Sequence, residues 1–186
     1  MKILAVSGSA RLLSTNTALL RALQAVAPAD MTVDVYDRIG DLPVFSPDLE
    51  GPGLPDSVRQ FMQAISESDG LVISSPEYVR SIPGGLKNAI DWLVSGDQVV
   101  GKPIALAHAS HRGDDMLAVL RTVLSTISSN FTETIFLRVP VTKETPEAIL
   151  LLLGTGENRV AAEGFLRDFA LFCQQGGNDS PDSMAV

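Results

Sequence analysis

Two short segments of the chain carry polar side chains at a spacing suited to ligand binding. The first, residues 7–17, offers several hydroxyl groups and one guanidinium, supplied by Ser9, Arg11, Ser14, Thr15 and Thr17. It follows an apolar run at residues 2–6 and precedes a segment with helical apolar spacing. At the amino end of a helix, unpaired backbone N–H groups favour an anion, and an arginine adds a forked cation. The segment therefore predicts a phosphate site, although serine and glycine also serve as ordinary caps at such a turn.

The second segment, residues 74–93, joins an expected strand at residues 70–73 to an expected helix. Pro76 keeps the residue before it extended, and Pro83 suits the first turn of a helix. The large polar side chains between the two prolines are Glu77, Tyr78 and Arg80. A loop held rigid by two prolines can hydrogen-bond the polar edge of a flat ring. The alternative is that its prolines and glycines only mark the start of the helix.

Neither common glycine-rich nucleotide motif is present in the first segment. A P-loop needs a second glycine and a lysine that are missing here, and Ala10 and Leu13 replace the second and third glycines of G-x-G-x-x-G. Direct binding of a dinucleotide at this turn is therefore disfavoured. No Ser-His-Asp set, carboxylate pair or metal-spaced histidine cluster is apparent by motif. We accordingly expect no metal ion and no catalytic side chain.

Strands and helices alternate along the chain. Apolar runs predict strands at residues 2–6, 32–36, 70–73, 103–107 and 134–137, and helical spacing predicts helices at residues 19–26, 56–65, 86–93, 116–127 and 161–172. This alternation predicts a parallel sheet, which places both polar segments at the carboxyl ends of strands. The connection at residues 37–55 is longer than usual, as in functional or interface segments. We expect one domain over residues 1–175 and a disordered tail over residues 176–186.

The composition limits the classes of function. Of 186 residues, 45% are hydrophobic and 19% are charged, as in a soluble globular protein. The formal net charge of −8 argues against nucleic acid and against an anionic membrane surface as partners. No apolar run approaches the roughly 20 residues of a membrane helix. The only cysteine is Cys173, so we expect a cytoplasmic protein in which this thiol is buried and unreactive.

The two segments together resemble those of a known family, the NAD(P)H-dependent FMN reductases of the flavodoxin-like superfamily, which include quinone, chromate and azo-compound reductases. The similar positions are Gly8-Ser9-x-Arg11-x-x-Ser14-x-Asn16-Thr17, Ser75-Pro76-Glu77-Tyr78 and Ile82-Pro83-Gly84-Gly85-Leu86-Lys87-Asn88-Ala89-Ile90-Asp91-Trp92-Leu93. The resemblance spans residues 2 to about 130. It implies an α/β, flavodoxin-like three-layer sandwich with a five-stranded parallel sheet in the order 2-1-3-4-5. FMN would lie at the ends of strands one, three and four.

The resemblance also assigns residues to parts of the cofactor. The FMN phosphate and ribityl chain would be bound by Ser9, Arg11, Ser14, Asn16 and Thr17. The isoalloxazine ring would be bordered by Pro76, Glu77, Tyr78, Val79, Arg80 and Ser81, with Ser110 and His111 on a third loop. The chain departs from the family at Val79 and Arg80, where asparagine followed by a small residue is usual. We expect Arg80 to attract the phosphates of a nicotinamide cofactor, the alternative being an exposed arginine without a role.

The implied activity is that of an FMN-dependent oxidoreductase. Hydride would pass from NADPH or NADH to FMN, and two electrons would then pass to a small acceptor such as a quinone, a flavin, an azo compound or a metal oxyanion. A flavodoxin-type electron carrier and a flavin-binding regulatory module are the alternatives. Apolar residues on more than one face of the helices at 86–94 and 116–127 lead us to expect a homodimer or homotetramer.

Overall fold

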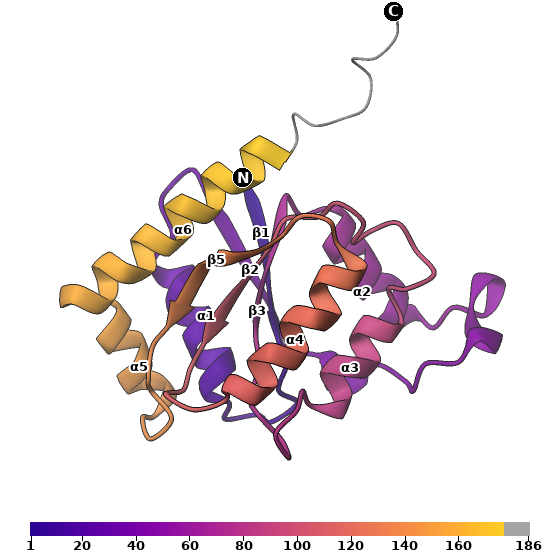
Figure 1. The fold of residues 1–186 in the computed structure, drawn as a ribbon, viewed down its shortest axis with the longest axis horizontal. Coiled ribbons are helices and arrows are strands. Elements are labelled where there is room, and N and C mark those ends of the chain that lie inside the picture. The colour runs from indigo at the N-terminus through magenta and orange to yellow at the C-terminus, as the bar shows by residue number, and fades with distance from the viewer. Residues whose placement is uncertain (177–186) are drawn as a thin grey trace, which may run out of the picture.

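The computed structural model describes residues 1–176, in which five strands form one parallel sheet (Figure 1). The strands are β1 (Lys2–Ser7), β2 (Thr32–Tyr36), β3 (Gly70–Ser74), β4 (Ile104–His108) and β5 (Phe131–Arg138). Their order is β2-β1-β3-β4-β5, and each neighbouring pair is parallel. The predicted order and the flavodoxin-like fold class are therefore confirmed. Parallel neighbours require crossover connections, which the intervening helices supply.

Helices pack on both faces of the sheet. One face is covered by α1 (Thr15–Val26), α5 (Pro146–Leu153) and α6 (Gly156–Gly176), and the other by α2 (Asp56–Ser66), α3 (Gly84–Asp91) and α4 (Asp114–Ile127). Because side chains alternate along a strand, β1 contributes Ile3 and Ala5 to the first core and Leu4 and Val6 to the second. Both faces of the central strands are thus buried, which explains their continuous apolar runs.

The long connection at residues 37–55 is fastened to α3. It contains three short 3₁₀ helices, η1 (Ile39–Asp41), η2 (Pro47–Leu49) and η3 (Gly51–Gly53), of which η2 and η3 project beyond α3 in Figure 1. The Phe45 N–H donates to Asn88 Oδ1 over 2.8 Å, and Trp92 Nε1–H donates to the Pro43 carbonyl over 2.8 Å. The Phe45 ring also meets the Trp92 ring edge-on, with centroids 5.1 Å apart. Trp92 is therefore a packing residue.

The carboxyl-terminal part of the structure differs from the elements that the sequence pattern predicts. The segment at residues 146–153 forms α5, which the pattern did not predict because its run of leucines has no polar face. Thr145 caps this helix by accepting the Ala148 N–H over 3.2 Å. Strand β5 begins at Phe131 rather than at the predicted residue 134. The register of its pairing with β4 shifts along the strand, so its apolar residues do not follow a regular alternation. Gly176 ends α6, whereas the remainder of the predicted tail, residues 177–186, lies outside the described residues.

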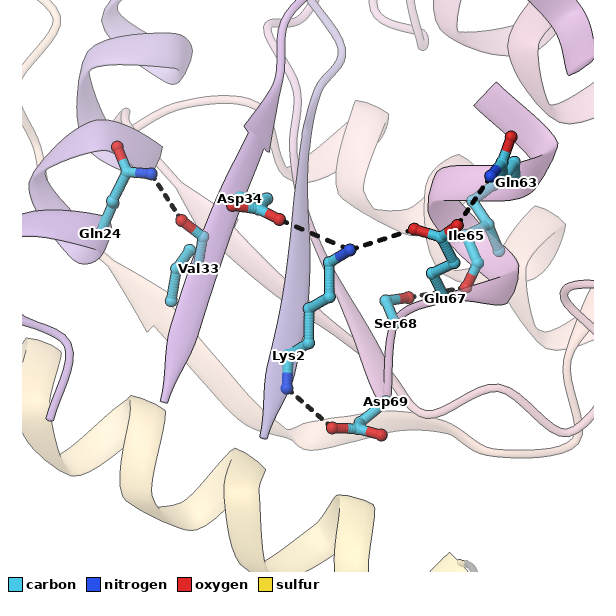
Figure 2. A network of polar contacts seen from close by, with 9 residues as sticks. All are labelled: Lys2, Gln24, Val33, Asp34, Gln63, Ile65, Glu67, Ser68 and Asp69. Carbon is cyan, nitrogen blue, oxygen red and sulfur yellow. Dashed lines mark hydrogen bonds and ion pairs between the residues drawn. The ribbon is translucent and has the colours of Figure 1, made fainter. Parts of the chain in front are cut away.

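A polar network fastens the amino end of the sheet (Figure 2). Lys2 Nζ lies 3.3 Å from Glu67 Oε2 and 3.7 Å from Asp34 Oδ2, while the Lys2 backbone N–H donates to Asp69 Oδ2 over 2.7 Å. Hydrogen bonds from Gln63 and Lys2 lower the pKa of the Glu67 carboxyl. Exposed ion pairs of this kind stabilise a fold only slightly. The main role of this network is to join β1, β2 and the start of β3.

Candidate functional site

The carboxyl ends of β1, β3 and β4 meet at one edge of the sheet, around a hollow of about 270 Å³. We call it the central hollow. Thr15 and Asn16 of α1, residues 75–77 after β3, and residues 108–110, 112 and 113 around the end of β4 form most of its wall, and Thr142 completes it. Parallel sheets bind ligands at this edge, so the hollow lies where the sequence places the site.

The amino end of α1 presents free backbone donors to the central hollow. Ser14 caps the helix, because its Oγ accepts the Thr17 N–H over 3.3 Å and its carbonyl accepts the Ala18 N–H over 2.9 Å. Thr15 and Asn16 are the first two residues of the helix, so their N–H groups have no partner inside it. Both residues line the hollow. This end of α1 can therefore bind an anion.

The side chains of Asn16 and Thr17 are directed into the protein. Asn16 Oδ1 accepts the Ser74 hydroxyl hydrogen over 2.9 Å, and Thr17 Oγ1 lies 2.8 Å from Ser7 Oγ. All four side chains are buried. These two hydrogen bonds join α1 to the ends of β3 and β1. The sequence assigns Asn16 and Thr17 to the cofactor, and in the structure their side chains hold the β1–α1 loop in place.

Ser9 and Arg11 lie on the far side of the same loop. The Ser9 hydroxyl accepts the Arg11 N–H over 3.2 Å, and Ser9 is 4% exposed. The Arg11 guanidinium is exposed and donates from Nε to the Leu13 carbonyl over 2.8 Å. Arg11 and Thr17 line a second hollow of about 290 Å³ between the ends of β1 and β2. Of the five predicted phosphate residues, Asn16 thus lines the central hollow, Arg11 and Thr17 line the second, and Ser9 and Ser14 line neither.

The loop between β3 and α3 ends in a tight hairpin turn. The backbone N–H and carbonyl groups of Tyr78 and Ser81 bond each other, both over 3.0 Å. Val79 and Arg80, at the centre of the turn, have φ values of 52° and 58°. A turn with two left-handed central residues normally uses asparagine and glycine, and a β-branched residue is a rare occupant. Val79 is therefore strained, and it is also 98% exposed.

Two side chains fasten this hairpin to the amino end of α4. Glu77 Oε2 accepts the Met116 N–H over 3.3 Å, and Arg80 Nε lies 2.6 Å from Asp115 Oδ2. The hydrogen bond to Asp115 raises the pKa of the Arg80 guanidinium. Asp115 therefore offsets part of the Arg80 charge at this position.

His108 is buried at the end of β4, and it also lines the central hollow. Its Nε2 lies 2.5 Å from the Arg112 carbonyl, which only accepts, so Nε2 carries the hydrogen. Burial is the largest effect on its pKa and lowers it. Gly113 has a φ of 103°, and a Cβ there would lie 2.8 Å from His108 Nε2. The β4–α4 loop is thus folded closely around a neutral imidazole.

The predicted residues and the central hollow overlap in part. Four of them line it, namely Asn16, Pro76, Glu77 and Ser110. Ser9, Ser14 and Thr17 shape the loop beside it, whereas Tyr78, Val79, Arg80 and Ser81 form the hairpin, and His111 is exposed outside the lining. Thr15, a predicted hydroxyl donor of the first segment, also lines it, and the lining residues that the sequence did not assign to a ligand are Ser75, His108, Ala109, Arg112, Gly113 and Thr142. All of them except Thr142 come directly after a predicted strand, and this position was the signal that the sequence offered. Thr142 follows β5 without a motif.

A larger hollow of about 800 Å³ lies at the opposite edge of the sheet and contains Asp69, Lys102 and Cys173. Ligands of parallel sheets bind at the carboxyl edge, so the central hollow is the better candidate. Burial raises the pKa of the Cys173 thiol to about 12, in keeping with the predicted unreactive cysteine. Within residues 1–176, no cluster of side chains could hold a metal ion, and no helix is long and apolar enough to cross a membrane.

The donor set of the central hollow fits a phosphate ester with a polar chain. The N–H groups at the start of α1 suit the phosphate, and the hydroxyl of Ser110 offers a further hydrogen bond. Next to the lining residues Pro76 and Glu77 lies Tyr78, which is 51% exposed. Tyr78 can cover part of an aromatic face. The geometry therefore accepts a phosphorylated molecule with an aromatic ring.

Comparison with known proteins agrees with this geometry. The sequence model of the family described as NADPH-dependent FMN reductase matches residues 1–138. A quinone reductase of Escherichia coli (strain K12) is 38% identical over 113 residues, which cover 59% of this chain and 60% of that protein. A 2-hydroxy-1,4-benzoquinone reductase of a Burkholderia species is 48% identical over 92 residues, covering 50% and 49%.

The solved structures include a similar fold over nearly the whole chain. FerB, a flavoenzyme NAD(P)H:(acceptor) oxidoreductase from Paracoccus denitrificans, superimposes with a TM-score of 0.71 and 26% identity. The superposition covers 94% of this chain and 98% of FerB. By sequence, in contrast, the chain spans 60% or less of the length of the two reductases named above. The family model, which matches residues 1–138, includes both polar segments.

Proposed function

Because the chain belongs to the NADPH-dependent FMN reductase family, we propose that it binds FMN in the central hollow and passes electrons from NADPH or NADH to a small acceptor. The observation that carries this proposal is the position of the free N–H groups of Thr15 and Asn16, which face a hollow walled by the loops after β3 and β4. FMN, when bound, supplies the two-electron chemistry, and the protein supplies position and electrostatics.

The residues of the first loop would bind the phosphate end of FMN. The N–H groups of Thr15 and Asn16 would donate to the phosphate, and Arg11 would add a charge-assisted bond after leaving the Leu13 carbonyl. Ser9 and Ser14 would keep the loop in this shape, since their hydroxyls already accept its backbone N–H groups. A phosphate here is bound mainly by backbone groups that folding has already placed.

The second and third loops would border the ring. Pro76, Glu77 and Tyr78 would border the ring directly. The hairpin residues Val79, Arg80 and Ser81 would border the side of the ring that is open to solvent. Ser110 and His111 would approach from the β4–α4 loop. Since none of these side chains has a catalytic arrangement by motif, their contribution is to orient the ring and to limit access to it. Quinones are the acceptors we favour, because two of the similar proteins are named for them.

We further propose that residues 1–175 act as one domain in the cytoplasm and assemble as a homodimer or homotetramer through α3 and α4. Most apolar residues of these helices are buried within the chain, so the support comes from the exposed Val119 on α4 and from Val94 and Val100, which are exposed in the connection that follows α3. Sedimentation at several micromolar concentrations tests the assembly, because a mass fixed at that of the monomer would contradict it.

The proposed function is tested by reconstitution. The apo-protein is titrated with FMN, and the loaded protein is then mixed with NADPH or NADH and a benzoquinone under anaerobic conditions. We expect stoichiometric FMN binding and quinone reduction that depends on the nicotinamide cofactor. Binding of FMN without oxidation of either cofactor would favour an electron carrier or a regulatory module instead. Absence of FMN binding would refute the proposal.

A further inference from the structure

One buried nitrogen in the wall of the central hollow has no partner. His108 lines the hollow and is 2% exposed. Its Nε2–H donates to the Arg112 carbonyl, and within residues 1–176 its Nδ1 is buried without a hydrogen-bond partner. A neutral imidazole that donates from Nε2 can only accept at Nδ1. The wall of the hollow therefore contains a fixed acceptor that lacks a donor.

The charges around His108 favour this neutral form. Burial is the largest effect on the pKa of the imidazole and lowers it, and the positive charge of Arg138, which faces His108 in the β4–β5 pairing, lowers it further. Asp114 raises the pKa, but its carboxylate is paired with Arg138. Near neutral pH, Nδ1 therefore stays unprotonated.

The neighbours of the ring show which way Nδ1 faces. Gly113 lies against the other edge, since a Cβ on it would be 2.8 Å from Nε2 and 3.0 Å from Cε1. After burial, which lowers the pKa of His108, the backbones of Arg112 and Ser75 act in the opposite direction as hydrogen-bond acceptors. Because Arg112 occupies Nε2, Ser75 lies beside Nδ1. Ser75 also lines the hollow, so Nδ1 is on the edge of the ring that borders it.

An acceptor without a donor limits which part of a ligand can lie against it. A phosphate dianion offers no hydrogen, so the phosphate belongs at the start of α1, where the backbone supplies N–H groups. Strand β3 separates β1 from β4, so the ends of these two strands lie about 10 Å apart by the usual strand spacing. A hydroxyl group on the chain that follows the phosphate falls within this span. The ring, by contrast, is placed next to Tyr78 in the proposed function.

We infer that His108 is a cofactor-binding residue whose Nδ1 accepts a hydrogen bond from a hydroxyl group of the ribityl chain of FMN. This inference rests on the proposed function and extends it, because the hydroxyl groups of the chain then help to determine which ligand is bound. A phosphorylated flavin without these hydroxyl groups would leave Nδ1 unpaired, and an unpaired buried acceptor lowers affinity. The sequence had assigned the exposed His111 of the same loop instead.

Paired ligands test the inference by binding alone. Wild type and His108→Leu are titrated with FMN and with an analogue in which a saturated pentyl chain joins the same ring to the same phosphate. In His108→Leu the affinity for FMN should fall about fivefold to tenfold, as for the loss of one hydrogen bond, and that for the analogue should change by less than about twofold. His108→Gln, whose amide oxygen can accept a hydrogen bond, should retain part of the affinity for FMN.

Ala109→Gly is the matched control for the titrations. Ala109 is buried in the same wall and has no polar side-chain atom, so its replacement should leave the ratio of the two affinities unchanged. Equal weakening of both ligands in His108→Leu would show that His108 only supports the loop, and it would overturn the inference. Unchanged binding of both ligands would also overturn it.

Nitrogen-15 spectra of the wild-type protein give a readout that does not depend on the folding of a variant, and the spectrum of His111→Gln assigns the two histidines. In the apo-protein, Nδ1 of His108 should have the signal of an unprotonated nitrogen. This signal should move upfield when FMN binds, because a donated hydrogen bond shields the nitrogen. The analogue has the same ring, so it controls for ring effects and should produce a smaller shift. A protonated Nδ1, or equal shifts with both ligands, would overturn the inference, whereas failure of the wild type to bind FMN would refute the proposed function itself.

Discussion

The two loops that border the central hollow are built in opposite ways. In the β1–α1 loop, Ser9 and Ser14 are each 4% exposed and accept hydrogen bonds from the loop's own backbone. In the β3–α3 loop, Tyr78 and Val79 are 51% and 98% exposed, and the turn contains two residues with positive φ. The first loop is fixed by buried short side chains. The second is fixed by the half-buried side chain of Glu77 and the exposed side chain of Arg80, which reach across to α4.

This difference separates two tasks at one edge of the sheet. A loop whose donors are fixed by folding can bind a phosphate without a further entropic cost, which favours affinity. A loop that is exposed, strained and held by long side chains can be altered without damage to the core, which favours adjustment of access and specificity. Changes in the first loop should therefore reduce stability and FMN affinity, whereas changes in the second should leave both nearly intact.

The largest effect is expected for Gly8→Ala. Gly8 donates its N–H to the Ser74 carbonyl over 2.7 Å, and a Cβ at this position would lie 2.8 Å from Ser75 Oγ and 2.9 Å from Leu86 Cδ2. Overpacking of this kind should lower the free energy of unfolding by about 2 kcal/mol. Urea denaturation of the apo-protein measures it. Gly84→Ala is the matched control, since a Cβ there meets nothing within 4 Å, and an equal loss in both variants would contradict the prediction.

Arg11→Ala should lower the affinity for FMN without lowering stability. The guanidinium is exposed and bonds only the Leu13 carbonyl of its own loop, so its removal leaves the fold unchanged. Loss of one charge-assisted bond to the phosphate should weaken FMN binding about tenfold. Fluorescence titration of the apo-protein gives the dissociation constant. Unchanged affinity would show that the backbone N–H groups of α1 hold the phosphate without Arg11.

The pH dependence of stability should report the burial of His108. Its pKa is lowered in the folded protein, chiefly by burial, from about 6.5 in the unfolded chain. Below about pH 6.5 the unfolded chain takes up a proton that the folded one does not, so stability should fall with pH, by at most about 1.4 kcal/mol per pH unit. His108→Gln should remove this slope between pH 5.5 and 6.5. His111→Gln, at the exposed second histidine, should retain it.

Much of this comparison could be predicted from the sequence, because the apolar runs and their spacing predict a parallel sheet with both loops at one edge, and the family resemblance implies the order of its strands. The partners of individual side chains could not be predicted. Asn16 and Arg80 are polar residues in a binding motif, yet one bonds Ser74 and the other Asp115, both far away in the chain. The strain at Val79 likewise depends on the φ that the fold imposes. Helix α5 was missed for a different reason, since its leucine run has no period to detect.

The smallest effect, and the most direct test of strain in the second loop, is expected for Val79→Asn. A β-branched side chain in the left-handed region costs roughly 1–2 kcal/mol, and asparagine adopts this conformation more readily. Because Val79 is 98% exposed, its replacement loses almost no packing, so the free energy of unfolding should rise by about 1 kcal/mol. Val44→Asn is the matched control: Val44 is 83% exposed and is not among the residues of 1–176 with positive φ, so it should gain nothing. Urea denaturation of the two apo-proteins compares their free energies of unfolding. FMN titration of Val79→Asn should give an affinity within about twofold of wild type, since the β1–α1 loop is untouched. A loss of stability at Val79 would mean that the valine is held in place by contacts that outweigh its strain, and the contrast between a fixed loop and an adjustable one would then fail.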